Sequence, residues 1–172
     1  KDISDLSNPP TCPRGKVLCS IRSRVLRGCD YIFDSRSRIT TDARPMKVDY
    51  KIVESVVANC GGDREWYREY MVGNYPRVAG DHAMIRSHVA REAGILDIGA
   101  VPPLLAALLA NDGYRNIHVV DPHARSFEAF FRREKIGYTS VDVLADLPDE
   151  LRGRFGLVCL NEVIEHLGGN LL

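Results

Sequence analysis

The sequence lacks the features that mark membrane-bound, secreted or disulfide-stabilised proteins. It has no apolar run near the roughly 20 residues of a membrane span, and its first ten residues lack the apolar segment of a signal peptide. Its five cysteines are an odd number without a Cys-x-x-Cys pair, so neither a disulfide framework nor a structural zinc site is indicated. We therefore expect a soluble, cytoplasmic protein with reduced thiols and no membrane partner.

Length and composition indicate a folded chain. Of the 172 residues, 45% are hydrophobic and 27% are charged, which is close to the average of soluble domains and excludes a disordered or coiled-coil class. The length suits one domain of ordinary size, or one domain with an extension, and is sufficient to bury a core.

Basic residues gather at the start of the chain. Residues 1–47 hold ten Lys and Arg against five Asp, although the formal charge of the whole chain is zero. Such a basic extension can meet phosphate or an acidic partner, which makes nucleic acid a secondary candidate partner. Aromatic residues do not alternate with the arginines as a stacking platform for bases requires, so we favour a solvated leader. Short strands are expected within it, over 16–21 and 30–33.

Residues 48–93 carry a helical pattern. Apolar residues recur at three- and four-residue spacing over 48–57, and Gly61-Gly62 then breaks the run. Asp63 is positioned to cap a second helix, and a third helical segment is expected over 81–92. Three aromatic residues of this region either pack against the core, which we favour, or cover a ligand pocket: Trp66, Tyr70 and Tyr75.

From Gly94 onward, strand and helix patterns alternate, which is typical of parallel βαβ units. Apolar runs of strand length predict four strands, at 95–98, 117–120, 138–141 and 156–160. Helices are expected between them, over 102–110, 124–135 and 147–151, and the Pro-Pro pair at 102–103 suits the first turn of a helix. Each strand stops at a small or acidic residue, and open parallel sheets bind ligands beyond the carboxyl ends of their strands.

The residues at these strand ends carry a resemblance to a known family. They are Asp97-Ile-Gly99, Asp121, Asp142 and Asn161-Glu162. Over about 94–167 the arrangement resembles class I methyltransferases, which use S-adenosylmethionine as their cofactor. The resemblance implies an α/β, Rossmann-like sheet with helices on both faces, its first four strands present, after a mainly helical N-terminal region. It also implies three parts: a basic extension at 1–47, a helical cap region at 48–93 and a cofactor-binding domain at 94–172.

The resemblance assigns roles to the turn after the first strand. Asp97 would face the ammonium group of the cofactor, and the turn of Gly99 and Ala100 would pass close to it, with glycine leaving the space free. The family commonly has Gly-x-Gly-x-Gly here, whereas this chain has Val101 and Pro103 at the second and third glycine positions. A valine resists the positive φ that glycine adopts freely, so either the turn follows a different path or the cofactor is bound weakly or not at all.

The later strand ends complete the expected cofactor site. Asp121, with Pro122 beside it, would accept hydrogen bonds from the ribose hydroxyls. By the same resemblance, Asp142 would take the adenine amino group and Val143 would offer its backbone N–H to the ring. Asn161 would end the fourth strand beside the reactive methyl group.

The segment that points most directly to catalysis is Glu162-Val-Ile-Glu165-His166. If a helix begins after the strand, these three polar residues lie at i, i+3 and i+4 on one face. The unperturbed pKa of histidine suits a general base, so we expect His166 to be catalytic, with Glu162 as the second candidate. The string resembles the Glu-x-x-Glu-His element of small-RNA terminal 2′-O-methyltransferases, where these residues ligate a metal. Similar strings occur in metal-free methyltransferases, and we favour a site without metal.

These features favour a methyltransferase that acts on a small molecule, such as a sugar or a natural-product precursor, most of all by O-methylation. One alternative is a catalytically inactive, methyltransferase-like module that serves in binding or assembly. Another is a metal-assisted RNA ribose 2′-O-methyltransferase. The small-molecule methyl acceptor is then the main partner, besides the cofactor.

The number of expected strands bears on the extent of the chain. The family's sheet usually has seven strands, and only four are expected by Leu160. We favour a fragment of a longer protein. Otherwise the strand-like pieces near Lys16 and Asp30, or a partner chain, complete the sheet. The region before Gly94 would serve as a cap or an oligomerisation element, which makes a second copy of the chain a candidate partner.

Overall fold

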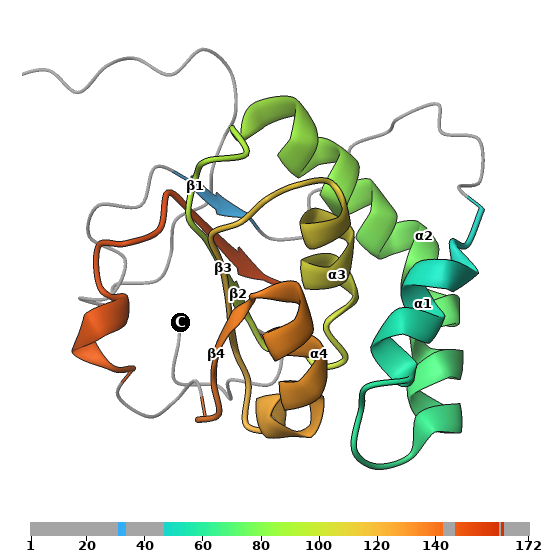
Figure 1. The fold of residues 1–172 in the computed structure, drawn as a ribbon. Helices are drawn as coiled ribbons and strands as arrows, with labels where there is room; N and C mark the ends of the chain where they lie inside the picture. Colours follow the sequence, from blue (N-terminus) through green and yellow to red (C-terminus); the bar gives the residue numbers. More distant parts are fainter. Residues whose placement is uncertain (1–30, 34–46, 143–146, 162, 164–172) are drawn as a thin grey trace, which may run out of the picture.

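The protein is built around a parallel β-sheet, which the computed structural model places beside a layer of helices (Figure 1). The described residues are 31–33, 47–142, 147–161 and 163. The sheet has the order β1-β5-β2-β3-β4, and every pairing in it is parallel. Its strands are β1 (Tyr31–Phe33), β2 (Ile95–Ile98), β3 (Ile117–Val120), β4 (Gly137–Thr139) and β5 (Leu157–Leu160). The prediction of an α/β chain with a parallel sheet is confirmed.

Within the described residues, the four strands expected from Gly94 onward are present, and a fifth joins them. β2 and β3 have the predicted bounds, while β4 and β5 are shorter than their apolar runs. The fifth strand, β1, comes from the N-terminal region and confirms the strand expected at 30–33. It pairs with β5 over three residues, so the outer edge of β5 is hydrogen-bonded rather than open. The strand expected at 16–21 lies outside the described residues.

Two helices precede β2, and each begins at an aspartate. In α1 (Tyr50–Val57) the Asp49 carboxylate accepts from the backbone N–H groups of the first turn at 2.9 and 3.4 Å. In α2 (Arg64–His88) Asp63 accepts in the same way at 3.1 and 3.0 Å, so the predicted cap is confirmed. The expected break before 81 is wrong, because α2 runs through Pro76 as one helix. Both its halves bury apolar side chains in the same core, which offsets the backbone hydrogen bond that proline cannot donate. Among the described residues, no helix combines the length and hydrophobicity that a membrane crossing needs.

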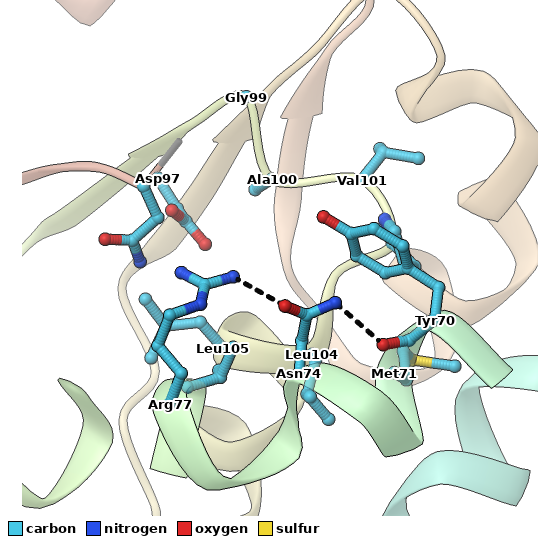
Figure 2. A pocket seen from close by; sticks show the side chains of 13 residues that line it. Tyr70, Met71, Asn74, Arg77, Asp97, Gly99, Ala100, Val101, Leu104 and Leu105 are labelled. Atoms are coloured by element: carbon cyan, nitrogen blue, oxygen red, sulfur yellow. Dashed lines mark hydrogen bonds between the residues drawn. The ribbon is translucent and has the colours of Figure 1, made fainter. Parts of the chain in front are cut away.

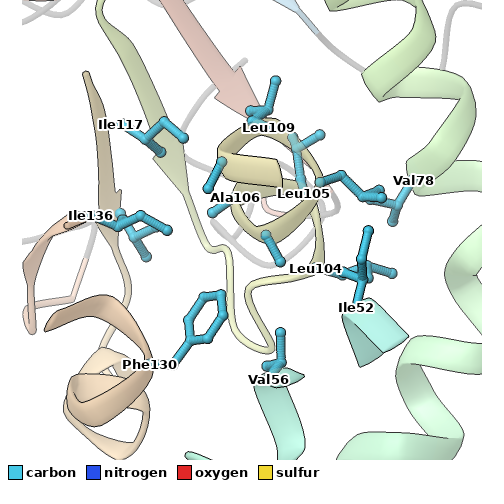
Figure 3. Close-up of a cluster of buried hydrophobic side chains, with 14 of the residues drawn as sticks. Ile52, Val56, Val78, Leu104, Leu105, Ala106, Leu109, Ile117, Phe130 and Ile136 are labelled. Carbon is cyan, nitrogen blue, oxygen red and sulfur yellow. The ribbon is translucent and has the colours of Figure 1, made fainter. Parts of the chain in front are cut away.

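The remaining helices connect the strands. They are α3 (Leu104–Asn111), the 3-10 helix η2 (Ala124–Phe127), α4 (Glu128–Glu134) and the 3-10 helix η3 (Asp149–Leu151). Pro103 precedes the first helical residue of α3 instead of lying within its first turn. All residues of α3 from 104 to 110 are buried, which explains its nearly continuous apolar sequence. Figure 3 shows α3 inside the helix layer, with side chains of α1, α2, α4 and the sheet around it.

The two faces of the sheet are covered differently. Helices α1 to α4 pack on one face, in a core that includes Ile95, Val119 and Cys159. The opposite face carries Leu96 and Leu160 and is covered by the β4–β5 connection, which contributes η3 and no described α-helix. The expectation of helices on both faces is met in part: among the described residues, the opposite face has the short 3-10 helix η3, within the helix expected at 147–151, and no α-helix. Because side chains alternate along a strand, Asp97 points to the same face as Ile95, toward the helices.

Candidate functional site

The carboxyl ends of β2 and β5 mark the place where the chain reverses its direction across the sheet. From β2 the chain proceeds to β3 and β4 on one side, and it then returns to place β5 on the other side of β2. Open α/β sheets bind ligands in the crevice at such a switch point. Asp97 lies near the end of β2 and Asn161 directly follows β5, so both belong to this crevice.

Helix α2 covers the crevice and leaves a small cavity beneath it (Figure 2). Its volume is about 50 Å³. From α2 come Tyr70, Asn74 and Arg77, and the Arg77 side chain extends toward Asp97. An Arg77 Nη2 to Asn74 Oδ1 hydrogen bond of 3.4 Å joins two of these side chains, and Asn74 Nδ2 donates to the Tyr70 carbonyl at 3.0 Å. The cavity thus has a polar wall on its helix side.

The Asp97 carboxyl group is the most perturbed acid of the site. It is only 2% exposed, and no hydrogen bond reaches it from the described residues. Burial raises its pKa to about 8, with further contributions from the nearby carboxyl groups of Asp81 and Asp121. Asp97 therefore holds a proton at neutral pH in this structure. A cation placed against it would favour loss of that proton.

Gly99 forms the sharp turn after β2. Its φ is +70°, and a Cβ there would collide with a Cγ2 methyl of Val163, in the segment after β5. The Gly99 N–H donates to the Val120 carbonyl at 2.8 Å, which fastens the turn to β3. Both its backbone conformation and its packing therefore require glycine, and the group that takes up the space is Val163.

Asp121, at the end of β3, is held by the backbone around it. Its Oδ2 accepts from the Val101 N–H at 3.2 Å, and its Oδ1 accepts from the His123 N–H at 2.7 Å. Burial raises the pKa of this carboxyl group, and these two backbone N–H groups oppose that effect. The acid thus ties the turn after β2 to the end of β3, a role that its position in the sequence did not reveal.

The structure brings together only some of the residues predicted to bind the cofactor. Those that line the cavity are Asp97, Gly99, Ala100 and Asn161. The cavity is not lined by Asp121, Pro122 or the exposed Asp142, which follow the two neighbouring strands. Outside the described residues lie Val143, the expected catalytic pair Glu162 and His166, and the third residue of the alternative metal set, Glu165.

The residues of α2 in the site were not predicted from the sequence, apart from Tyr70. Asn74 and Arg77 follow Tyr70 at four- and three-residue spacing, which places all three on one face of a helix. That signal was present, but it spans Pro76, where a continuous helix was not expected. Asp81, one turn further along α2, is buried and adds to the acidity of the site.

Comparisons of the chain with protein-family models, curated proteins and solved structures found no match. The site consists of a buried acid, an arginine and an amide oxygen that accepts no hydrogen bond from the described residues, around one small cavity at the switch point of a parallel sheet.

Proposed function

We propose that this chain is the cofactor-binding part of a class I methyltransferase and binds S-adenosylmethionine at the carboxyl ends of β2 and β5. The observation that carries the proposal is the sheet order. From β2 onward, the order β4-β3-β2-β5 equals the 3-2-1-4 part of a doubly wound, Rossmann-like sheet. A buried acid and a positive-φ glycine follow its first strand, at the switch point.

The polar groups of the cavity fit the amino-acid end of this cofactor. Asp97 would face the ammonium group, and Arg77 would face the carboxylate. The buried Oδ1 of Asn161 accepts no hydrogen bond from the described residues and would take a second ammonium proton. The carboxyl groups of Asp81 and Asp121 lie close enough to raise the pKa of Asp97, and this acidic surrounding favours a cationic ligand.

The volume of the cavity is smaller than the volume that the cofactor needs. Ligand pockets usually measure about 300 to 1,000 Å³, and this cavity measures about 50 Å³. Tyr70 and Arg77 of α2 occupy the crevice, so binding requires these side chains or α2 itself to move outward. We expect α2 to act as a cover that closes over the bound ligand.

When bound, S-adenosylmethionine supplies an electrophilic methyl group to a nucleophilic acceptor, and we propose a small-molecule hydroxyl as that acceptor. The part of this chain is to position the cofactor and to exclude water. Asp97 would release its proton to solvent when an ammonium group approaches, and the apolar lining around Met71 and Leu104 would limit the entry of water. Glu162 and His166 remain the predicted proton acceptors for the hydroxyl.

Calorimetric titration with S-adenosylhomocysteine at pH 7, in two buffers of different ionisation enthalpy, tests the proposal. We expect binding with release of up to one proton, because Asp97 is protonated before and ionised after binding. Asp97→Asn should bind more weakly and release no proton, whereas Asp149→Asn, which changes an exposed acid that does not line the cavity, should behave like the wild type. Absence of binding at millimolar ligand would refute the proposal.

A second candidate is a methyltransferase-like module without catalysis. The small cavity favours it, and so does Asp121, both of whose carboxylate oxygens already accept backbone N–H groups. This candidate predicts a folded protein that does not bind S-adenosylhomocysteine, so the same titration decides between the two.

A further inference from the structure

One face of α2 carries an uninterrupted series of side chains that leads from solvent into the cavity. Trp66, Tyr70, Asn74 and Arg77 follow one another at spacings of four, four and three residues, so they lie along a single stripe of the helix. Its aromatic end is open to solvent, since Trp66 is 51% and Tyr70 is 36% exposed. Its polar end lines the cavity beside Asp97.

The two exposed rings belong to a series of aromatic contacts that begins in the core. Trp66 and Tyr70 are stacked, with ring centroids 5.2 Å apart and planes 26° apart. The edge of Tyr67 meets Trp66 at 5.2 Å, and Tyr67 in turn meets the buried Phe127 at 4.9 Å. The exposed pair is thus the outer end of a chain of aromatic contacts that reaches the buried Phe127.

This arrangement differs from ordinary core packing. Tyr75, one turn further along α2, is buried in the core, as expected for an aromatic residue of a covering helix. Tyr70 instead borders the cavity together with Val101 and remains partly exposed. The stacked pair, of which Tyr70 lines the cavity, offers a flat apolar surface to a third ring, and the polar groups begin one turn deeper.

We propose that Trp66 and Tyr70 bind the planar aromatic ring of the methyl acceptor by stacking, with the hydroxyl groups of the acceptor directed along the stripe toward Asn74. The term acceptor rests on the proposed function, whereas the binding of an aromatic ring does not. The inference narrows the substrate class from small molecules in general to aromatic alcohols.

The chain offers a direct measurement, because Trp66 is its only tryptophan. Its fluorescence, excited at 295 nm, should report a ligand that stacks beside it. The probes are catechol and cyclohexane-1,2-diol, which share two neighbouring hydroxyl groups and differ in the aromatic ring. We expect saturable quenching by catechol at millimolar concentration and none by cyclohexane-1,2-diol.

Two variants locate the binding. Tyr70→Leu keeps an apolar side chain and removes the ring, so it should weaken catechol binding by about fivefold. Tyr50→Leu is the matched control, because Tyr50 is 58% exposed but does not line the cavity. Its catechol affinity should equal that of the wild type.

Several outcomes overturn the inference. They are equal quenching by both diols, no saturable quenching, equal effects of the two variants, and an emission change on dilution of the protein alone, which would indicate a protein–protein contact. Calorimetry with S-adenosylhomocysteine on Trp66→Leu separates this inference from the proposed function, because Trp66 does not line the cavity. Cofactor binding without catechol binding refutes only the ring site, and catechol binding without cofactor binding refutes only the methyltransferase.

Discussion

Asp97 and Asp121 come from neighbouring strands of one sheet, yet only one of the two carboxyl groups accepts hydrogen bonds from the described backbone. Asp97, on β2, is 2% exposed, and no described residue donates a hydrogen bond to it. Asp121, after β3, is 8% exposed and accepts two backbone N–H groups. The strands determine where the two carboxyl groups lie, and the neighbouring loop segments determine whether each carboxyl group accepts backbone hydrogen bonds.

The two carboxyl groups have different roles at this edge of the sheet. Burial and the nearby carboxyl groups disfavour the ionised form of Asp97. A cation that binds beside it would stabilise that form, and this favours binding of the cation. Asp121 is already satisfied and holds Val101, in the turn after β2, against the end of β3. The first acid is suited to ligand binding, and the second is suited to stabilising the turn that borders the site.

The largest loss of stability from one substitution should come from Gly99→Ala, which disturbs the turn between the two acids. The new methyl group would collide with Val163 at a φ of +70°, so the free energy of unfolding should fall by about 3 kcal/mol. Urea denaturation measures it. Val163→Ala in the same chain should restore part of the loss. Gly73→Ala is the matched control, since nothing lies near a Cβ within α2 there, and it should be neutral or slightly stabilising.

A separate effect is the pH dependence that Asp97 imposes on stability. Its pKa is about 8 in the folded chain and near 3.8 in the unfolded chain, so the unfolded state loses its proton first as the pH rises. Stability should therefore fall between about pH 4 and pH 8, by as much as about 1.4 kcal/mol per pH unit from this group. Asp97→Asn should remove that fall and be more stable than the wild type at pH 8. Parallel stability curves for the two proteins would contradict the buried, protonated state.

Asp121→Ala should test the carboxyl group that accepts backbone hydrogen bonds. Loss of the two accepted hydrogen bonds should lower the free energy of unfolding by about 2 kcal/mol. Amide hydrogen exchange should become faster at Val101 and His123. Asp149→Ala, which removes an exposed acid paired with Arg152, is the control and should leave both amides unchanged. Unchanged exchange at Val101 in Asp121→Ala would mean that the turn is held by other contacts.

Much of the sheet could be predicted from the sequence, and the reason is local. The apolar runs at 95–98 and 117–120 coincide with β2 and β3, because each run fills a strand that is buried on both faces. Asp63 predicted a helix start correctly, since a cap is a local interaction. β1 is harder to predict, because a strand of three residues gains its stability from pairing with β5, far along the chain.

The site was less predictable, because its groups meet only through tertiary structure. Asp97 and Asn161 could be placed in the site because both lie at strand ends. Arg77 could not be placed there, since its position depends on α2 continuing through Pro76 and lying over β2. Nor could Asp121 be distinguished from Asp97, because the difference between them is the pair of backbone N–H groups that reaches only one of them.

The smallest effect should come from the attachment of α2 above Asp97. Asp112, directly after α3, forms an ion pair with Arg86 at 2.7 Å and lies 3.2 Å from His82, and both of these residues belong to α2. Asp112→Asn should lower the free energy of unfolding by less than about 1 kcal/mol, because the Arg86 side chain is half exposed and solvent screens the pair. Amide exchange over 82–88 should nevertheless become faster. Glu54→Gln breaks an exposed pair with Arg68 near the start of α2 and should leave those amides unchanged. If Asp112→Asn also reduces the fall in stability toward pH 8, α2 is the element that keeps water from Asp97; an unaltered pH profile would assign that exclusion to α3 and the turn after β2 instead.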